Sequence, residues 1–167
     1  EYLRRIEWMK GARRDIAITT DIIVGFPGET EQDFEETLSL LDAVEYDSLF
    51  AFKYSRRPNT PAIALEDQLS EEEKSRRLAI LQEKQRAIQI RRNARLVGVI
   101  EECLVEGFNQ ATGQWIGRTS QNRTLNFTHP VTERPAQDAT LLGRYLPVQV
   151  TRSGPNSLAG EAWLPAA

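Results

Sequence analysis

Two loops near the start of the chain carry residue types suited to binding a cofactor or a phosphate. Residues 25–30 (GFPGET) combine two glycines, which let backbone approach a ligand closely, with apolar surface and one carboxylate. Residues 55–61 (SRRPNTP) carry Arg56 and Arg57, whose guanidinium groups suit phosphate contacts. Each loop follows an apolar, strand-like segment. Because sites in parallel α/β folds lie at the carboxyl ends of strands, we expect both loops to face one side and share a ligand.

The elements that must position these loops read as strand, helix, strand. Residues 16–24 are β-branched and mostly apolar, as in a buried parallel strand. A Thr30–Asp33 cap begins a helix with an apolar face over 34–44, and 48–54 form the next strand. This order predicts a βαβ unit with a right-handed crossover.

A long helix is predicted from residue 70 to about 95. Ser70 with Glu73 resembles a capping box, and no Gly or Pro interrupts the segment. Acidic residues are concentrated near the start of this helix and basic residues near its end. The helix dipole explains this polarity at least as well as an RNA-binding role for the bases.

The last part of the chain predicts a small all-β domain. Short β-rich runs alternate with Gly, Asn and Pro turns over 97–106, 115–118, 124–127, 146–151 and 157–163. This pattern is typical of a five-stranded barrel. The fold class is therefore α/β plus all-β, with a boundary near residue 95.

Basic residues of this β-rich part are the best RNA-binding candidates. From Leu96 onward the basic residues are all arginine. OB-like barrels bind nucleic acid with basic and aromatic side chains on one sheet face. We predict RNA contact for Arg118, Asn122, Arg123 and Asn126, and a core position for Phe127. For Arg56 and Arg57, contact with RNA and pairing with a nearby acid are equally open.

Composition narrows the class of protein. The 167 residues carry a net charge of −3, and no apolar run or secretory signal predicts a membrane span or export, so we expect a cytoplasmic protein. The only cysteine, Cys103, cannot hold an iron–sulfur cluster and reads as a small apolar residue in a strand. We assign no catalytic and no metal-binding residue. The chain starts without Met inside a helical pattern, so we expect a truncated N-terminus.

Four strings occur in an order that resembles the tRNA-modifying methylthiotransferases of the radical-SAM superfamily (MiaB type). The first, 20–34, is similar to a segment of radical-SAM enzymes, and the second, 52–62, to the methylthiotransferase branch. Asn59 stands where that branch usually has glycine, and we expect it to adopt the same left-handed turn. The strings 117–127 and 154–160 resemble the TRAM domain. The resemblance covers nearly the whole chain.

The resemblance implies a fold and an activity. Residues 1–69 would be the C-terminal part of a TIM-like radical-SAM barrel, 70–95 a linking helix and 96–167 a TRAM barrel. Such enzymes add a methylthio group to C2 of isopentenyl-adenosine beside the tRNA anticodon, using S-adenosylmethionine and two 4Fe–4S clusters, whose cysteines this chain lacks. The fragment is expected to be a monomer and inactive alone. The residues implied to line the cofactor pocket are Ile23, Gly25, Phe26, Pro27, Gly28 and Glu29.

Two other functions stay open. One is a non-catalytic RNA-binding module. The other is a sister methylthiotransferase that acts on threonylcarbamoyl-adenosine in tRNA or on a ribosomal protein.

Overall fold

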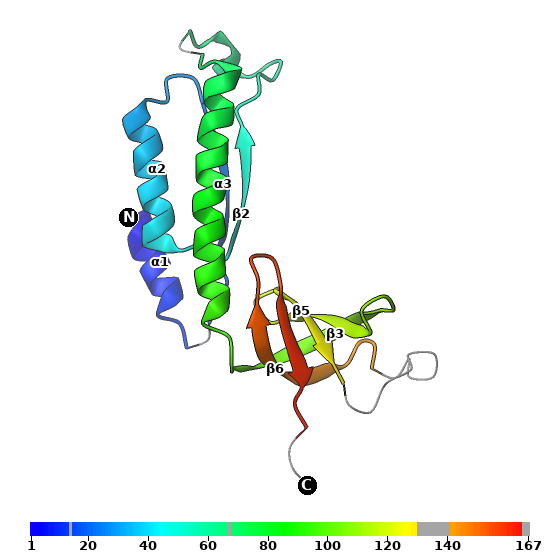
Figure 1. The fold of residues 1–167 in the computed structure, drawn as a ribbon. Coiled ribbons are helices and arrows are strands. Elements are labelled where there is room, and N and C mark those ends of the chain that lie inside the picture. The colour runs from blue at the N-terminus through cyan, green and yellow to red at the C-terminus, as the bar shows by residue number, and fades with distance from the viewer. Residues whose placement is uncertain (14, 67, 130–140, 165–167) are drawn as a thin grey trace. The chain divides into compact units, whose positions relative to one another are not determined.

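The computed structural model describes residues 1–13, 15–66, 68–129 and 141–164. These fall into two compact units, Glu1–Gln89 and Ile90–Ala167 (Figure 1). Within the described ranges, no helix has the length and apolar character needed to cross a bilayer.

The first unit contains the expected βαβ arrangement. Strand β1 (Thr19–Val24) pairs in parallel with β2 (Ser48–Lys53), and α2 (Glu31–Val44) connects them. Helix α1 (Tyr2–Lys10) precedes this motif, and the short 3-10 helix η1 (Pro61–Ala64) and α3 (Glu71–Ala94) follow it. β1 starts three residues later than the sequence predicted. Its partner strand, β2, begins only at Ser48. Just before the two strands, the Asp47 N–H donates to the Ile18 carbonyl oxygen and the Ile18 N–H donates to the Asp47 carboxylate, both at 2.9 Å.

Side-chain caps fix where the two long helices begin. The Thr30 hydroxyl accepts from the Asp33 N–H at 3.1 Å, and the Asp33 carboxylate accepts from the Thr30 N–H at 2.9 Å. This is a complete capping box, with Asp in the place usually taken by Glu. The Ser70 hydroxyl accepts from the Glu73 N–H at 3.1 Å, which starts α3 as predicted.

The two faces of the small sheet differ in burial. One face packs into the core of the unit, where Val24, Leu41 and Leu81 are fully buried. The other face carries Ile23 and Phe52, each 54% exposed. β1 and β2 therefore present an apolar surface at the end where the two candidate loops begin.

The second unit is a closed five-stranded barrel, as predicted. Its strands run in the order β3-β4-β5-β7-β6, and β6 pairs back onto β3. All pairs are antiparallel except β5 with β7. This mixed Greek-key order is that of an OB-like barrel. The strand bounds are β3 (Ile100–Asn109), β4 (Gln114–Thr119), β5 (Thr124–Thr128), β6 (Tyr145–Ser153) and β7 (Leu158–Ala162).

Two glycines and two β-bulges allow a barrel of only five strands to close. A Cβ at Gly117 would lie 2.3 Å from the Leu104 carbonyl oxygen, and one at Gly160 would lie 2.3 Å from that of Gln149. Bulges interrupt β3 between Val105 and Gly107 and β6 between Val150 and Arg152, where they increase the local bend. The core these strands enclose contains Cys103, Trp115 and Phe127, which confirms the core prediction for Phe127.

Candidate functional site

The two loops of the first unit line one hollow, as their positions after parallel strands predicted. The hollow measures about 480 Å³, within the range of small-molecule sites. Ile23 and Phe26 contribute from the first loop region, and Arg57 and Thr60 from the second. The remaining lining residues are Phe52, Lys53, Tyr54, Ser55 and Ala62.

Tyr54 is the most informative lining residue. Its ring packs edge-on against Phe26, with centroids 5.2 Å apart, and Lys74 Nζ lies 5.7 Å from the ring centroid. Its hydroxyl is buried and has no hydrogen-bond partner among the described residues. Because this oxygen has no accessible surface, it cannot be reached from the open hollow, and the rest of the Tyr54 side chain is what lines it. Sequence reasoning missed Tyr54, although it directly follows β2.

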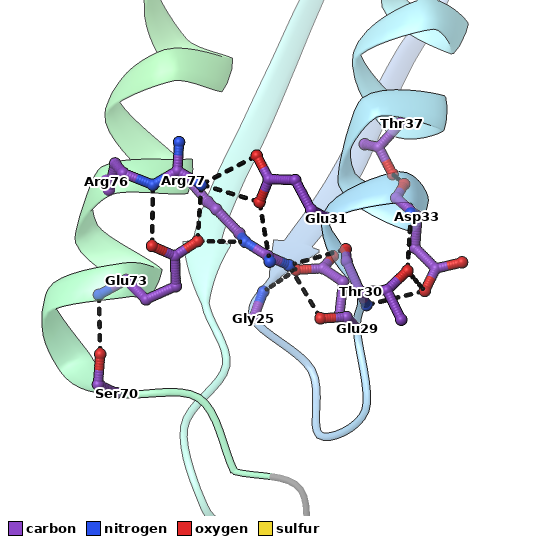
Figure 2. A network of polar contacts seen from close by, with 10 residues as sticks. All are labelled: Gly25, Glu29, Thr30, Glu31, Asp33, Thr37, Ser70, Glu73, Arg76 and Arg77. Carbon is purple, nitrogen blue, oxygen red and sulfur yellow. Dashed lines mark hydrogen bonds and ion pairs between the residues drawn. The ribbon is translucent and has the colours of Figure 1, made fainter.

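Glu29 and Gly25 build the first loop and do not line the hollow. The Glu29 carboxylate accepts from the Gly25 N–H and from Arg77 Nη1, both at 2.7 Å (Figure 2). Arg77 comes from α3, and its side chain is 5% exposed. It also donates to the main-chain oxygens of Glu29 and Thr30, at 3.1 and 3.2 Å. The guanidinium thus ties α3 to the turn.

Further ion pairs surround this contact. Glu73 bridges Arg76 and Arg77 (Figure 2). Hydrogen bonds from Arg76, and to a smaller extent from Arg77, lower the pKa of Glu73 to about 2. Glu73 therefore keeps its charge, and its contacts with both arginines, well into the acid range.

Gly25 is required where the chain passes α3. Its φ is +71°, and a Cβ there would lie 2.4 Å from Lys74 Cγ. Lys74 is itself buried and donates to Glu71 at 2.7 Å. Pro27 and Gly28 complete the turn and lie outside the hollow's lining.

The second loop adopts the turn expected from Asn59, whose φ is +64°. The Thr60 hydroxyl donates to the Arg57 carbonyl oxygen at 2.8 Å. Both Arg56 and Arg57 are exposed, and within the described part of the chain neither guanidinium makes an ion pair. Only Arg57 lines the hollow.

The four RNA candidates of the barrel occupy two different settings. Arg118 and Asn126 lie on the outward face of neighbouring strands, and each stands between two buried residues. Arg118 Nε forms an ion pair with Glu106 Oε2 at 3.3 Å. Asn122 holds a left-handed turn with φ +60°. Arg123 is half-buried, and its Nε donates to Asn93 at 3.2 Å.

Asn126 lines a second hollow, on the barrel. It measures about 300 Å³. Sequence reasoning did not single out its other polar lining residues. These are Gln114, Arg152, Ser153 and Ser157, with Gly154, Leu158 and Ala159 completing the wall.

Comparison with known proteins finds one domain family and several similar proteins. Residues 94–163 match the model of the TRAM domain. The chain is 68% identical over 162 residues to a tRNA-2-methylthio-N(6)-dimethylallyladenosine synthase of Solibacter usitatus, covering 97% of this chain and 36% of that protein. The same name is carried by proteins of Koribacter versatilis (56% identity, 96% of this chain, 35% of that protein) and Geotalea uraniireducens (45%, 96%, 35%). Over 96–97% of its length the chain therefore matches a part of the MiaB-type methylthiotransferases.

The chain spans about a third of the length of these methylthiotransferases. The family implies S-adenosylmethionine and iron–sulfur clusters. The described residues contain no group of three or more His, Cys, Asp or Glu side chains that could hold a metal ion. Cys103 is fully buried in the barrel, and burial raises its pKa to about 11. These residues therefore do not fit a cluster, whereas the hollow has the size and the apolar lining of a small-molecule site, which suit part of an adenosylmethionine.

Proposed function

We propose that this chain is the part of a radical-SAM methylthiotransferase that closes one side of the cofactor pocket and carries the RNA-binding barrel. The parent reaction would add a methylthio group to C2 of isopentenyl-adenosine beside the tRNA anticodon, in the cytoplasm and as a monomer. The observation that carries this proposal is the pairing, in one chain, of a ligand-sized hollow after two parallel strands with an OB-like TRAM barrel.

The first unit would serve the cofactor as a wall. Ile23, Phe26 and Tyr54 line the hollow and offer mainly apolar contact. Glu29, Gly25, Pro27 and Gly28 would act indirectly, by fixing the turn that carries Phe26. Bound adenosylmethionine, with the clusters, would supply the methyl group and the radical, and this chain would supply shape and exclusion of water.

The second unit would hold the tRNA. Arg118 and Asn126 present polar groups on the outward face of β4 and β5, and Asn122 and Arg123 form the turn between these strands. Arg56 and Arg57 would contact the RNA backbone from the cofactor side. Phosphate contacts position an RNA without reading its sequence.

The names of the relatives support isopentenyl-adenosine over the substrates of sister enzymes. All three proteins reported above are named for dimethylallyladenosine. Because the similarity extends over 97% of this chain, it favours part of an enzyme over a separate RNA-binding module.

A titration with a fluorescent anticodon stem-loop RNA at two salt concentrations tests the RNA-binding half of the proposal. We expect salt-sensitive binding that Arg118→Ala/Arg123→Ala weakens, with the slope of log K against log [salt] flattening by about 0.7–0.9 per lost phosphate contact. The matched control is Arg13→Ala/Arg86→Ala, which removes the same charge from exposed sites of the first unit. Absence of binding, or equal effects of both double changes, would contradict the assignment.

A further inference from the structure

We propose that the barrel hollow is a subsite for one sugar-phosphate unit of the bound RNA, with Arg152 as its cationic contact. This inference rests on the proposed RNA-binding function and adds a residue and a place to it. The polar residues that line the hollow are Gln114, Asn126, Arg152, Ser153 and Ser157.

Strand register brings the polar groups of the hollow together. Asn126 on β5 pairs with Ala159 on β7, and Ala159 pairs in turn with Arg152 on β6. The three residues therefore form one row across three adjacent strands. With strands about 4.8 Å apart, Asn126 and Arg152 stand about 10 Å from each other. The methyl group of Ala159 leaves the space between them open.

The bulge in β6 places Arg152 in this row. Val150 pairs with Gly160, and the next paired residue of β6 is Arg152, so Thr151 is the inserted residue. Without the insertion Thr151 would stand opposite Ala159. Bulges commonly redirect a side chain in this way. The Thr151 hydroxyl donates to the Ala159 carbonyl oxygen at 3.4 Å, which links the two strands at the bulge.

Asn93 fixes the rim of the hollow. It is 5% exposed, and its amide nitrogen donates to the carbonyl oxygens of Gly154 and Pro155, at 2.8 and 3.3 Å. Its amide oxygen accepts from Arg123 Nε at 3.2 Å. The turn between β6 and β7 is thereby held before any ligand arrives, which lowers the ordering cost of binding.

The chemistry of the lining selects the ligand. Among the described residues, no hydrogen bond or ion pair engages the side chains of Gln114, Asn126, Arg152, Ser153 or Ser157. The hollow thus offers one guanidinium, two amides and two hydroxyls, and no acid or aromatic ring lines it. Without a ring there is no platform for base stacking. Donors around one cation suit a phosphodiester with its ribose hydroxyl.

Arg144 offers a matched control. Like Arg152 it is exposed, and among the described residues its guanidinium has no hydrogen bond or ion pair. It directly precedes β6, whereas Arg152 lies near the end of that strand. Eight residues of extended chain separate them by roughly 25 Å. Replacing either arginine by alanine removes the same charge, so a difference between the two variants reports contact and not net charge.

The test is fluorescence anisotropy of the whole chain with a labelled anticodon stem-loop RNA, over a salt series. We expect Arg152→Ala to weaken binding about tenfold and to flatten the salt slope by about 0.7–0.9, Arg152→Lys to retain most of that slope, and Arg144→Ala to change affinity less than twofold. Ala159→Leu, which fills the hollow without removing a polar group, should also weaken binding. Thermal unfolding of each variant checks that the barrel stays folded.

The outcomes separate the two proposals. Tight, salt-sensitive binding by the unmodified chain with equal effects of Arg152→Ala and Arg144→Ala would overturn the subsite and leave the RNA-binding function standing. Binding unaffected by a folded Ala159→Leu variant would also overturn it. No binding by the unmodified chain would overturn both.

Discussion

Replacing Glu29 by alanine should loosen the Gly25–Thr30 turn. The change removes the carboxylate that accepts from the Gly25 N–H and from Arg77 Nη1. Each buried donor left unpaired costs about 1–3 kcal/mol. Leaving a buried charge without its partner typically costs about 3–5 kcal/mol of stability. Because Arg77 keeps Glu73 and Glu31 as partners, we expect the loss of stability to stay below the upper end of that range. We therefore expect destabilisation of the first unit by about 2–4 kcal/mol.

Hydrogen exchange read by mass spectrometry localises this effect, and urea unfolding measures its size. We expect faster exchange in peptides covering 22–32 and unchanged exchange in the barrel, because the two units each have their own core. Glu29→Gln keeps an acceptor for the Gly25 N–H and should lose less. Glu35→Ala, on the exposed side of α2, is the control and should change stability by no more than about 0.5 kcal/mol. Unchanged exchange in 22–32 and an unchanged urea midpoint for Glu29→Ala would refute the structural role given to this carboxylate.

Three further predictions concern packing. Gly25→Ala should destabilise the chain more than Gly28→Ala in urea unfolding, because both have positive φ but only a Cβ at Gly25 would strike Lys74; equal losses would contradict this. Gly117→Ala should prevent closure of the barrel, seen as loss of dispersed amide signals in an NMR spectrum, whereas Gly107→Ala, which has open space, should keep them. Cys103 should react with iodoacetamide at pH 8 at least about 100-fold more slowly in the native chain than in urea, because it is buried and its raised pKa keeps the thiol protonated; rapid native labelling would show that the barrel opens.

Local sequence signals predicted the elements well. Thr30 and Ser70 mark helix starts because their hydroxyls cap nearby N–H groups, a contact within four residues. The alternation of Leu125, Asn126 and Phe127 predicts which side chains enter the core, since successive strand residues point to opposite faces. The left-handed turn at Asn59 was expected because the similar family usually has glycine at this position and Asn tolerates the same backbone conformation.

Local sequence signals of this kind could not predict contacts between residues that are far apart in the sequence. Arg77 reaches Glu29 across 48 positions, and no spacing rule links a helix residue to a loop that far away. The row of Asn126, Ala159 and Arg152 depends on a single inserted residue in β6. One residue of register turns a strand's side chains to the other face, so this row becomes visible only when the pairing is known.

A chimera gives the most direct test of the central claim. The part of the Solibacter usitatus enzyme that aligns with this chain, 36% of that protein, would be replaced by this chain and expressed in a bacterial strain that lacks its own methylthiotransferase. Mass spectrometry of nucleosides from digested tRNA would then measure methylthio-isopentenyl-adenosine. We predict that the chimera restores this nucleoside, and that Phe26→Asp, placed in the wall of the hollow, abolishes it while the protein still accumulates. A stable chimera that leaves only isopentenyl-adenosine in the tRNA would contradict the account.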